Sequence, residues 1–579
     1  MTEKLTVTSE RIDDIPLLLA QLEKMQVAKL LDKHFPTHGN WQGMSLGKVA
    51  VVWLTFILTE ANHRLSHVQD WAEQRLRMLS GCLGQEVRGL DFSDDRLPVI
   101  LDELSDDQQW SVFEQALNRR TLRVYNLQPE RVRIDSTSAK GYVEVSADGL
   151  FQFGHSKDHR PDLPQIKINI SVLDPLGLPL TTTVLSGETA DDPLYIPEIK
   201  RVQASLSCQG VTYIGDCKMA AIQTRAYVVD SKNYYLCPLS ALQLDNEELV
   251  QLLKPVWTKQ QALTSVYRDE TADEAELIAE GFEHNVALES DLDGKTIKWQ
   301  ERRLVIRSLQ YAKSQARALD ERVKKACQNI NDLNRRAQGK KRFNAEAELQ
   351  QAAREIENKY EVAGLLQCNY TTTVIEKPLR RYGQRDASTK VESNVSVTAH
   401  IDEVAMAETK GTLGWRVYAT NQSAKELSLQ QAVLAYRAEY LVEAAFARLK
   451  GKVLSLMPIY LGTDNRIIGL VRLLMIGLRV LTLLEFSARE QLQKETASLE
   501  GIYPGNPKRA TERPTTEMML RAFEGLTLTL ITEANRTTTH VTALSPVQQR
   551  ILQLLGFSSD IYLHLCQHFS KSALNLSET

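Results

Sequence analysis

The chain has 579 residues, which corresponds to about three to four domains of ordinary size. Hydrophobic residues make up 43% and charged residues 25%, and 69 Lys and Arg against 73 Asp and Glu give a net charge of −4. This composition is typical of a globular protein and excludes a collagen-like, disordered or purely coiled-coil chain. Because the total charge is nearly zero, it indicates no particular partner, and charge has to be considered segment by segment.

The cysteines and the N-terminal segment indicate the compartment. The seven cysteines are scattered, odd in number and include no C-x-x-C pair, which is typical of a reduced, cytosolic protein. Residues 1–14 are polar and carry acidic side chains, unlike a secretory or transit signal. We therefore expect a cytoplasmic protein.

Two apolar stretches could be mistaken for membrane spans. Residues 49–58 are far fewer than the roughly 20 needed to cross a bilayer, and residues 467–486 are interrupted by Arg472, Arg479 and Glu485. We expect both stretches to be buried helices and expect no membrane partner.

Residues 1–130 show helical periodicity almost throughout, as in Ile15, Leu18 and Leu22. They predict a helical domain. This domain could bind a partner or pair two copies of the chain, or its helices could serve only for packing. From residue 131 the pattern changes to short apolar runs, which predict strands over 131–135, 165–173, 178–185, 212–216 and 234–239, with helices over 193–207 and 219–229. This order of elements predicts an α/β core that begins with hairpin-connected strands.

A large insertion follows, and its charge is polarised. Residues 268–295 hold ten Asp and Glu against two Lys and Arg (−8), and residues 301–342 hold thirteen Lys and Arg against four Asp and Glu (+9). Apolar residues at helical spacing over 319–333 and 349–360 predict an antiparallel helical hairpin. A solvated face is one interpretation of its charge, and a phosphate-binding arm that uses Lys324, Lys325, Arg335 and Arg336 is the other.

Beyond the hairpin, residues 395–401 alternate with period two, and residues 415–419 form another β-like run. A long helix is then predicted over 428–452, where Ser428 and Gln431 form an S-x-x-Q capping box.

Two aspartates, Asp135 and Asp216, stand at the ends of predicted strands, in RVRID and TYIGD. A rigid sheet can hold two such carboxylates close enough to share divalent metal ions. One Asp after a strand is more often a turn residue, however, and Asp216 would also suit the start of the following helix. The metal interpretation therefore needs a third acid.

The third acid is Glu443, on the predicted helix 428–452. Tyr436, Glu443 and Lys450 are spaced by seven residues, which returns each to nearly the same face of a continuous helix. Apolar neighbours place Glu443 at the edge of the core, where a carboxylate needs a cation or a metal. An ordinary ion pair on the helix surface is the alternative.

The helix YRAEYLVEAAFARLK resembles the Y-(2)-R-(3)-E-(6)-K signature of insertion-sequence DDE transposases. Tyr436, Glu443 and Lys450 stand at matching positions, and Glu439 stands where the signature has Arg. Residues 154–180 are similar to the block after the first catalytic Asp of that branch, and TYIGDCKMAA is similar to its second-Asp strand. The matches keep the family order over residues 91–480.

The resemblance implies an α/β RNase H-like core with a helical N-terminal domain and a large mixed β and helical-hairpin insertion before the last catalytic helix. The domains expected on this basis are a helical DNA-binding or dimerisation domain (1–130), the first part of the core (131–240), the insertion with the basic hairpin (241–410), the last part of the core (411–490) and a helical C-terminal region (491–579).

The resemblance also implies a DNA transposase, a metal-dependent endonuclease and polynucleotidyl transferase that binds the ends of its element. Asp135, Asp216 and Glu443 would be the catalytic residues and would hold two Mg²⁺ ions, with Mn²⁺ as an alternative. The partners would be double-stranded DNA, as transposon ends and target, and a second copy of the chain bound to that DNA. The protein would then be associated with the nucleoid.

The expected DNA contacts follow the same resemblance. Tyr436 and Lys450 would contact phosphates near the transposon end, and Arg437 and Arg448 could replace the missing signature Arg. The positively charged loop that follows the strand with Asp135 adds four more expected DNA contacts, His155, Lys157, His159 and Arg160. Zinc binding by the two histidines is disfavoured, because their segment has the composition of a loop and no Cys is near.

Two other functions compete with transposition. A domesticated, catalytically idle DNA-binding protein would keep the fold, but the intact set of three acids argues against it. A stand-alone RNase H-like nuclease or resolvase is the second alternative, and hydrolysis alone would not require the basic insertion and the helical N-terminal domain.

Overall fold

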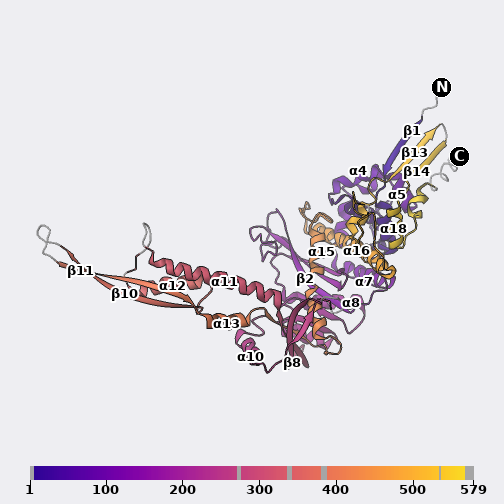
Figure 1. Ribbon diagram of the computed structural model, residues 1–579. Coiled ribbons are helices and arrows are strands. Elements are labelled where there is room, and N and C mark those ends of the chain that lie inside the picture. The colour runs from indigo at the N-terminus through magenta and orange to yellow at the C-terminus, as the bar shows by residue number, and fades with distance from the viewer. Residues whose placement is uncertain are drawn as a thin grey trace. The chain divides into compact units, whose positions relative to one another are not determined.

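The computed structural model describes residues 5–269, 275–335, 342–343, 345–379, 388–506, 508–533 and 536–566 (Figure 1). The chain divides into two compact units. The first unit comprises Met1–Leu236, Glu289–Ile297 and Tyr436–Thr579, and the second comprises Cys237–Leu288 and Lys298–Ala435.

The N-terminal part of the first unit is helical, as predicted. Its helices are α1 (Ile15–Lys24), α2 (Val27–His34), α3 (Leu46–Glu60), α4 (Val68–Glu73), α5 (Leu76–Leu83), α6 (Leu97–Leu104) and α7 (Asp107–Val124), with short 3₁₀ turns at Leu65–His67 and Gly89–Phe92. Helix α3 is buried over most of its length, because its apolar residues cover the whole circumference.

A small sheet joins the two ends of the chain. Strand β1 (Thr6–Arg11) pairs antiparallel with β13 (Thr527–Glu533), which pairs with β14 (Arg536–Val541). The C-terminal region also holds α17 (Thr516–Arg521) and α18 (Pro546–Leu555). The expectation of purely helical N- and C-terminal regions is therefore wrong at these strands, which form through pairing between distant segments.

Helix α16 (Asp464–Glu495) crosses the first unit. It is long and apolar enough to span a membrane, but 94% of its most apolar window is buried inside the protein. Gly469 lies against α6, where a Cβ atom would overlap the carbonyl oxygen of Leu101. Arg472 pairs with Asp107, and Arg479 pairs with Glu114 at 3.2 Å, so the charges inside the helix are compensated. The buried helix predicted over 467–486 is confirmed.

The main sheet of the first unit contains the strands predicted from the sequence. These are β2 (Arg131–Lys140), β3 (Gln165–Asp174), β4 (Leu178–Ser186), β5 (Thr212–Ile214) and β6 (Tyr234–Pro238), in the spatial order β4-β3-β2-β5-β6. The pairs β2–β3 and β3–β4 are antiparallel, and the pairs β2–β5 and β5–β6 are parallel. Helices α8 (Tyr195–Leu206), after a 3₁₀ turn at Asp192–Leu194, and α9 (Ile222–Asp230) connect the later strands. The mixed α/β architecture is as expected.

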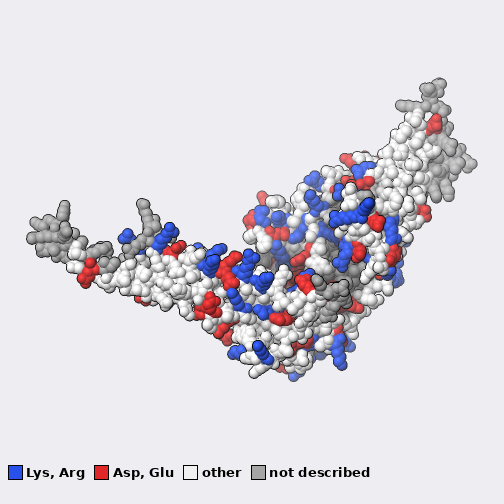
Figure 2. Space-filling view, in the orientation of Figure 1, with Lys and Arg blue, Asp and Glu red and all other residues white. Residues whose placement is uncertain are grey.

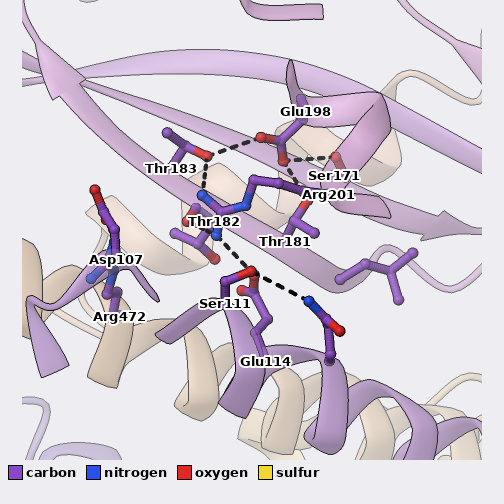
Figure 3. Close-up of polar contacts among 12 residues, drawn as sticks. Asp107, Ser111, Glu114, Ser171, Thr181, Thr182, Thr183, Glu198, Arg201 and Arg472 are labelled. Carbon is purple, nitrogen blue, oxygen red and sulfur yellow. Dashed lines mark hydrogen bonds and ion pairs between the residues drawn. The ribbon is translucent and has the colours of Figure 1, made fainter. Parts of the chain in front are cut away.

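A buried polar network fixes α8 against this sheet (Figure 3). The carboxylate of Glu198 accepts hydrogen bonds from Ser171, Thr181 and Thr183. Arg201 donates to the Thr183 hydroxyl at 2.9 Å and to Glu114 on α7 at 3.1 Å. Because buried charges are held only where they are paired, this network gives α8 one position on the sheet.

The second unit contains strands that carry many charges, except for their residues Glu289–Ile297, which belong to the first unit. They lie in the order β12 (Trp415–Thr420), β9 (Lys295–Ser308), β8 (Leu277–Leu292) and β7 (Thr264–Tyr267), and α10 (Asn246–Trp257) precedes them in the chain. Arg302 pairs with Glu283 at 2.8 Å, and Arg307 pairs with Glu280 at 3.5 Å. The start of the +9 segment is thus a strand neutralised by the −8 segment beside it, and it does not belong to a helical hairpin.

The hairpin itself is found further along, in an arm of the second unit. Helices α11 (Leu309–Asn331), continued by a 3₁₀ turn at Asp332–Asn334, and α12 (Glu346–Tyr360) pack on β11 (Ser388–Ile401), which pairs antiparallel with β10 (Leu366–Leu379). Helix α13 (Glu403–Thr412) returns the chain to the sheet. Leu319, Val323 and Leu349 lie in the apolar core of the arm. The spacing of these residues therefore predicted the helices correctly.

Candidate active site

Asp135 and Asp216 lie on the same wall of one cleft. Asp135 is the fifth residue of β2, and Asp216 follows β5 by two residues. Strand β2 continues to Lys140, so the expectation that Asp135 ends its strand is wrong. Because β2 and β5 are parallel with Arg133 beside Ile214, each aspartate lies two residues beyond this pair, and the register brings the two together. The cleft is lined by Arg133, Ile134, Asp135, Ile214, Gly215, Asp216, Tyr436, Glu439 and Val442.

The carboxylate of Asp216 is oriented by its neighbours. Its Oδ1 atom accepts a hydrogen bond from the hydroxyl of Tyr195 at 2.7 Å and from the amide of Lys218 at 2.9 Å. Tyr195 is the first residue of α8, so the buried network of that helix fixes the hydroxyl. Asp216 is not the cap of α9, whose N-cap is Ala221. In the described chain no hydrogen bond reaches the second carboxylate oxygen.

Asp135 is oriented in the same way, through one oxygen. Its Oδ1 atom accepts hydrogen bonds from the amide of Ser136 at 2.7 Å and from Lys157 Nζ at 3.2 Å. Burial raises the pKa of Asp135, with a further contribution from the charge of Asp216, and Lys157 only partly offsets this rise. The raised pKa indicates a carboxylate that lacks a sufficient positive partner.

The helix predicted over 428–452 is broken. Helix α14 (Leu429–Arg437) starts at the predicted capping box of Ser428 and Gln431, and α15 (Tyr440–Lys450) begins after two turn residues. Tyr436 lies on α14, whereas Glu443 and Lys450 lie on α15, so the continuous helix expected to carry all three residues is interrupted between them.

The break brings Glu439 to the cleft. Burial raises the pKa of Glu439, and the charges of Asp135 and Glu443 raise it further, whereas Arg133 lowers it. Both glutamates are exposed to solvent, so the expectation that Glu443 lies at the edge of the core is wrong, and Glu439 belongs to the described lining of the cleft whereas Glu443 does not. In the sequence Glu439 is the one departure from the family signature and lies one turn from Glu443, and the structure places it in the lining of the cleft.

Lys450 lies at the C-terminal end of α15 and is bound to residues near Asp135. Its ammonium group donates to Asp158 Oδ1 at 2.7 Å, to Thr137 Oγ1 at 2.9 Å and to the carbonyl oxygen of Ser138 at 3.3 Å. The structure thus brings Lys450 next to the strand that carries Asp135.

The other predicted DNA contacts are dispersed. Arg448 pairs with Glu517 at 2.8 Å and with Glu485, so it ties α15 to α16 and α17. Arg437 ends α14 and is half-buried. His155 and His159 lie on the loop 154–163, and Arg160 on that loop pairs with Asp162 at 2.7 Å.

In the arm, Lys324, Lys325 and Arg335 are exposed, and Arg336 lies outside the described residues. Figure 2 shows basic and acidic side chains mixed along α11. Arg317 on this helix is 3.7 Å from Glu321, and Arg322 pairs with Glu361 at 2.7 Å. Part of the positive charge of the segment is therefore compensated within the arm.

A second cleft shares Ile134, Asp135 and Asp216 with the first. It is lined by Ile134, Asp135, Ser136, Asn169, Asp191, Leu194, Tyr195 and Asp216. Asp191 accepts hydrogen bonds from Lys167 at 2.8 Å and from Ser136 at 2.9 Å. Burial acts to raise the pKa of Asp191, but these hydrogen bonds outweigh it and lower the pKa. The sequence did not single out Asp191.

The carboxylates of the first cleft provide some of the ligands that a divalent cation needs. Asp135 and Asp216 each offer one carboxylate oxygen that accepts no hydrogen bond in the described structure, and such oxygens are the ligands that Mg²⁺ prefers. The parts of the chain that the structure describes contain no group of three or more His, Cys, Asp or Glu arranged to hold a metal ion. Two of the expected ligands therefore fit, and a third would have to move toward them.

Comparisons with known proteins add little to this site. No protein-family model matches the chain, and no curated protein matches it. Among solved structures it is similar to a chain of the piggyBac transposase synaptic complex with hairpin DNA, at 12% identity and a TM-score of 0.24. The similarity covers 51% of this chain and 62% of that chain, which is less than two thirds of its length. A similarity this weak assigns neither the fold nor the activity.

Proposed function

We propose that this protein is a DNA transposase of the DDE type, which cuts DNA strands at the ends of its element and joins them to a target. The observation that carries the proposal is the cleft in which Asp135 and Asp216 meet, on adjacent parallel strands, opposite the segment that resembles the transposase signature. The order β4-β3-β2-β5-β6, with three antiparallel strands followed by two parallel ones, supports an RNase H-like core.

In this proposal Asp135, Asp216 and Glu443 hold the metal ions. Glu443 becomes the third ligand when the segment around the helix break moves, and Glu439 acts beside it without binding metal. Bound Mg²⁺ would lower the pKa of an attacking water or 3′-hydroxyl and stabilise charge on the leaving oxygen. The hydroxyl of Tyr195 keeps Asp216 in one orientation, so its second oxygen stays available in the cleft.

The DNA is bound by separate positive groups. Lys450 contacts a phosphate close to the reacting strand, because it lies beside the strand of Asp135. Tyr436 lines the cleft beside the part of β2 that carries Asp135. The exposed lysines of the arm, Lys324 and Lys325, bind other phosphates of the DNA. We further propose that two copies act together on DNA, in the cytoplasm at the nucleoid.

A cleavage and joining assay tests the function. The substrate is a plasmid that carries the DNA segments flanking the gene, incubated with the full-length protein and Mg²⁺. We expect cuts at the boundaries of the element and products joined to a second plasmid. Cuts without any joined product would favour a nuclease, and DNA binding without cuts would favour a catalytically idle relative.

A further inference from the structure

The loop 154–163 places two neighbouring charged residues on two different groups of the candidate site. Lys157 Nζ lies 3.2 Å from Asp135 Oδ1 and donates to the hydroxyl of Ser136 at 3.1 Å. Asp158 Oδ1 lies 2.7 Å from Lys450 Nζ. A cation of the loop thus faces the carboxylate expected to bind metal, and an anion of the loop faces the lysine expected to bind DNA phosphate.

The Lys450–Asp158 pair is sheltered from water. The side chains of Lys450 and Asp158 are 17% and 19% exposed, respectively, so the pair is weakened by solvent less than a surface pair would be. With Asp158, Thr137 and Ser138 as acceptors, all three donors of the ammonium group are used. A phosphate can therefore reach Lys450 only by displacing an acceptor, and Asp158 is the charged one among the three.

Asp158 has little else to hold it. Its second carboxylate oxygen, Oδ2, is buried and has no hydrogen-bond partner within the described structure. A buried carboxylate oxygen without a donor is unfavourable, so the position of Asp158 depends on Lys450. The contact is therefore suited to exchange for another anion.

We propose that the loop 154–163 is a self-inhibiting latch, in which Asp158 occupies the phosphate position at Lys450 and Lys157 occupies a cation position at Asp135. The proposal rests on the proposed function and adds its regulation. DNA phosphate displaces Asp158, and because Lys157 directly precedes Asp158 in the chain, the same movement withdraws Lys157 from Asp135. Binding of DNA at Lys450 and of a cation at Asp135 are then coupled, and the coupling is reciprocal.

The test compares two substitutions on the same loop that replace a carboxylate by an uncharged amide, Asp158→Asn and Asp162→Asn. Both remove one negative charge, but Asp162 pairs with Arg160 and is 59% exposed. The affinity of the full-length protein for a labelled DNA duplex is measured by fluorescence anisotropy without divalent metal. We expect Asp158→Asn to tighten binding about tenfold and Asp162→Asn to tighten it less than about threefold. Equal effects of the two substitutions would overturn the latch.

A double substitution shows whether the effect passes through Lys450. When Lys450→Gln is already present, adding Asp158→Asn should increase the DNA affinity by no more than Asp162→Asn does. A gain that survives without Lys450 would contradict the proposal. Asp158→Ala serves as a second variant if Asp158→Asn does not fold, with the same expected result.

The cation side of the latch has its own measurement. Lys157→Met keeps the aliphatic stem and removes the charge, so Mn²⁺ binding measured by calorimetry should tighten about tenfold. Unchanged Mn²⁺ affinity would remove Lys157 from the latch. The proposed function fails in a different way, since in that case neither the wild type nor any variant would bind the duplex.

Discussion

The guanidinium group of Arg133 on β2 donates a hydrogen bond of 3.4 Å to the carbonyl oxygen of Tyr436 at the end of α14. In a continuous helix this oxygen would accept the amide of Tyr440. Arg133 is buried and also pairs with Asp174 at 3.2 Å, so its position is fixed by the sheet. The strand that carries Asp135 therefore also contacts the chain at the point where the helix is interrupted, next to Glu439 in the same cleft.

The first prediction separates the two glutamates at this break. Glu443→Gln should lower metal-dependent cleavage by about 100-fold or more, because it removes a metal ligand. Glu439→Gln should retain cleavage within about tenfold of the wild type. Loss of a negative neighbour also lowers the pKa of Asp135, so the acid limb of the pH–rate profile of Glu439→Gln should move to lower pH.

The control for both variants is DNA affinity measured without metal, which should stay within about threefold of the wild type. The reverse pattern, with activity abolished in Glu439→Gln and kept in Glu443→Gln, would make Glu439 the third ligand.

The second prediction concerns Tyr195. Tyr195→Phe removes the hydroxyl that orients Asp216 and should raise the Mn²⁺ concentration needed for half-maximal cleavage roughly tenfold, with little change in the rate at saturating metal. Tyr227→Phe is the matched control, since its hydroxyl donates to Gln203 at 3.0 Å, away from the cleft. Equal metal dependence of the two variants would exclude a role for Tyr195 in positioning Asp216.

The third prediction concerns the arm. Replacing Lys324, Lys325 and Arg335 by Gln should reduce the slope of log Kd against log salt by up to about 0.9 for each DNA phosphate that the variant no longer neutralises. Arg317→Gln is a control on the same helix, because Arg317 already faces Glu321. The slope is measured by fluorescence anisotropy over a range of salt concentrations. An unchanged slope in the triple variant would leave these residues as part of a solvated face.

The fourth prediction is a pH dependence of stability in the N-terminal helices. Asp14 is 7% exposed and accepts a hydrogen bond from Thr59 at 2.9 Å. Burial raises its pKa to about 7, and the charges of Asp13 and Glu60 contribute. The folded state thus keeps a proton that the unfolded state has released, so stability should fall as the pH rises from about 4 to about 7 and stay low above that.

Asp14→Asn should increase the free energy of unfolding by on the order of 3 kcal/mol at pH 8 and change it little at pH 4. The measurement is the urea midpoint at both pH values, with Asp102→Asn as an exposed control on α6. Equal pH dependence of the wild type and Asp14→Asn would show that another group is responsible.

Features set by short stretches of sequence could be predicted. The strands of the main sheet, α8, and the arm helices around Val323 and Leu349 all follow from the spacing of apolar residues within a few turns or strand lengths. The strands that lead to Asp135 and Asp216 were predicted in the same way, although β2 continues past Asp135 to Lys140. In each case the responsible residues are neighbours in the chain.

Features set by distant contacts could not be predicted. The break at residues 438–439 occurs where Arg133, about 300 residues earlier in the chain, donates a hydrogen bond to the carbonyl oxygen of Tyr436. Strand β1 forms on β13, more than 500 residues away. Strands β8 and β9 were not predicted from the sequence, because their charged residues, such as Glu283 and Arg302, neutralise each other only when the strands pair. The contact between Asp158 and Lys450 depends in the same way on the folded chain.

Mn²⁺ binding to the metal-free, full-length protein tests the central claim most directly, because it requires neither DNA nor turnover. Electron paramagnetic resonance measures free Mn²⁺ in titrations of the wild type, Asp135→Asn and Asp216→Asn, with Asp162→Asn as the control. We expect saturable binding to the wild type and the control, and a loss of Mn²⁺ affinity of at least about tenfold in each of the other two variants. Equal Mn²⁺ affinity in all four proteins would contradict it.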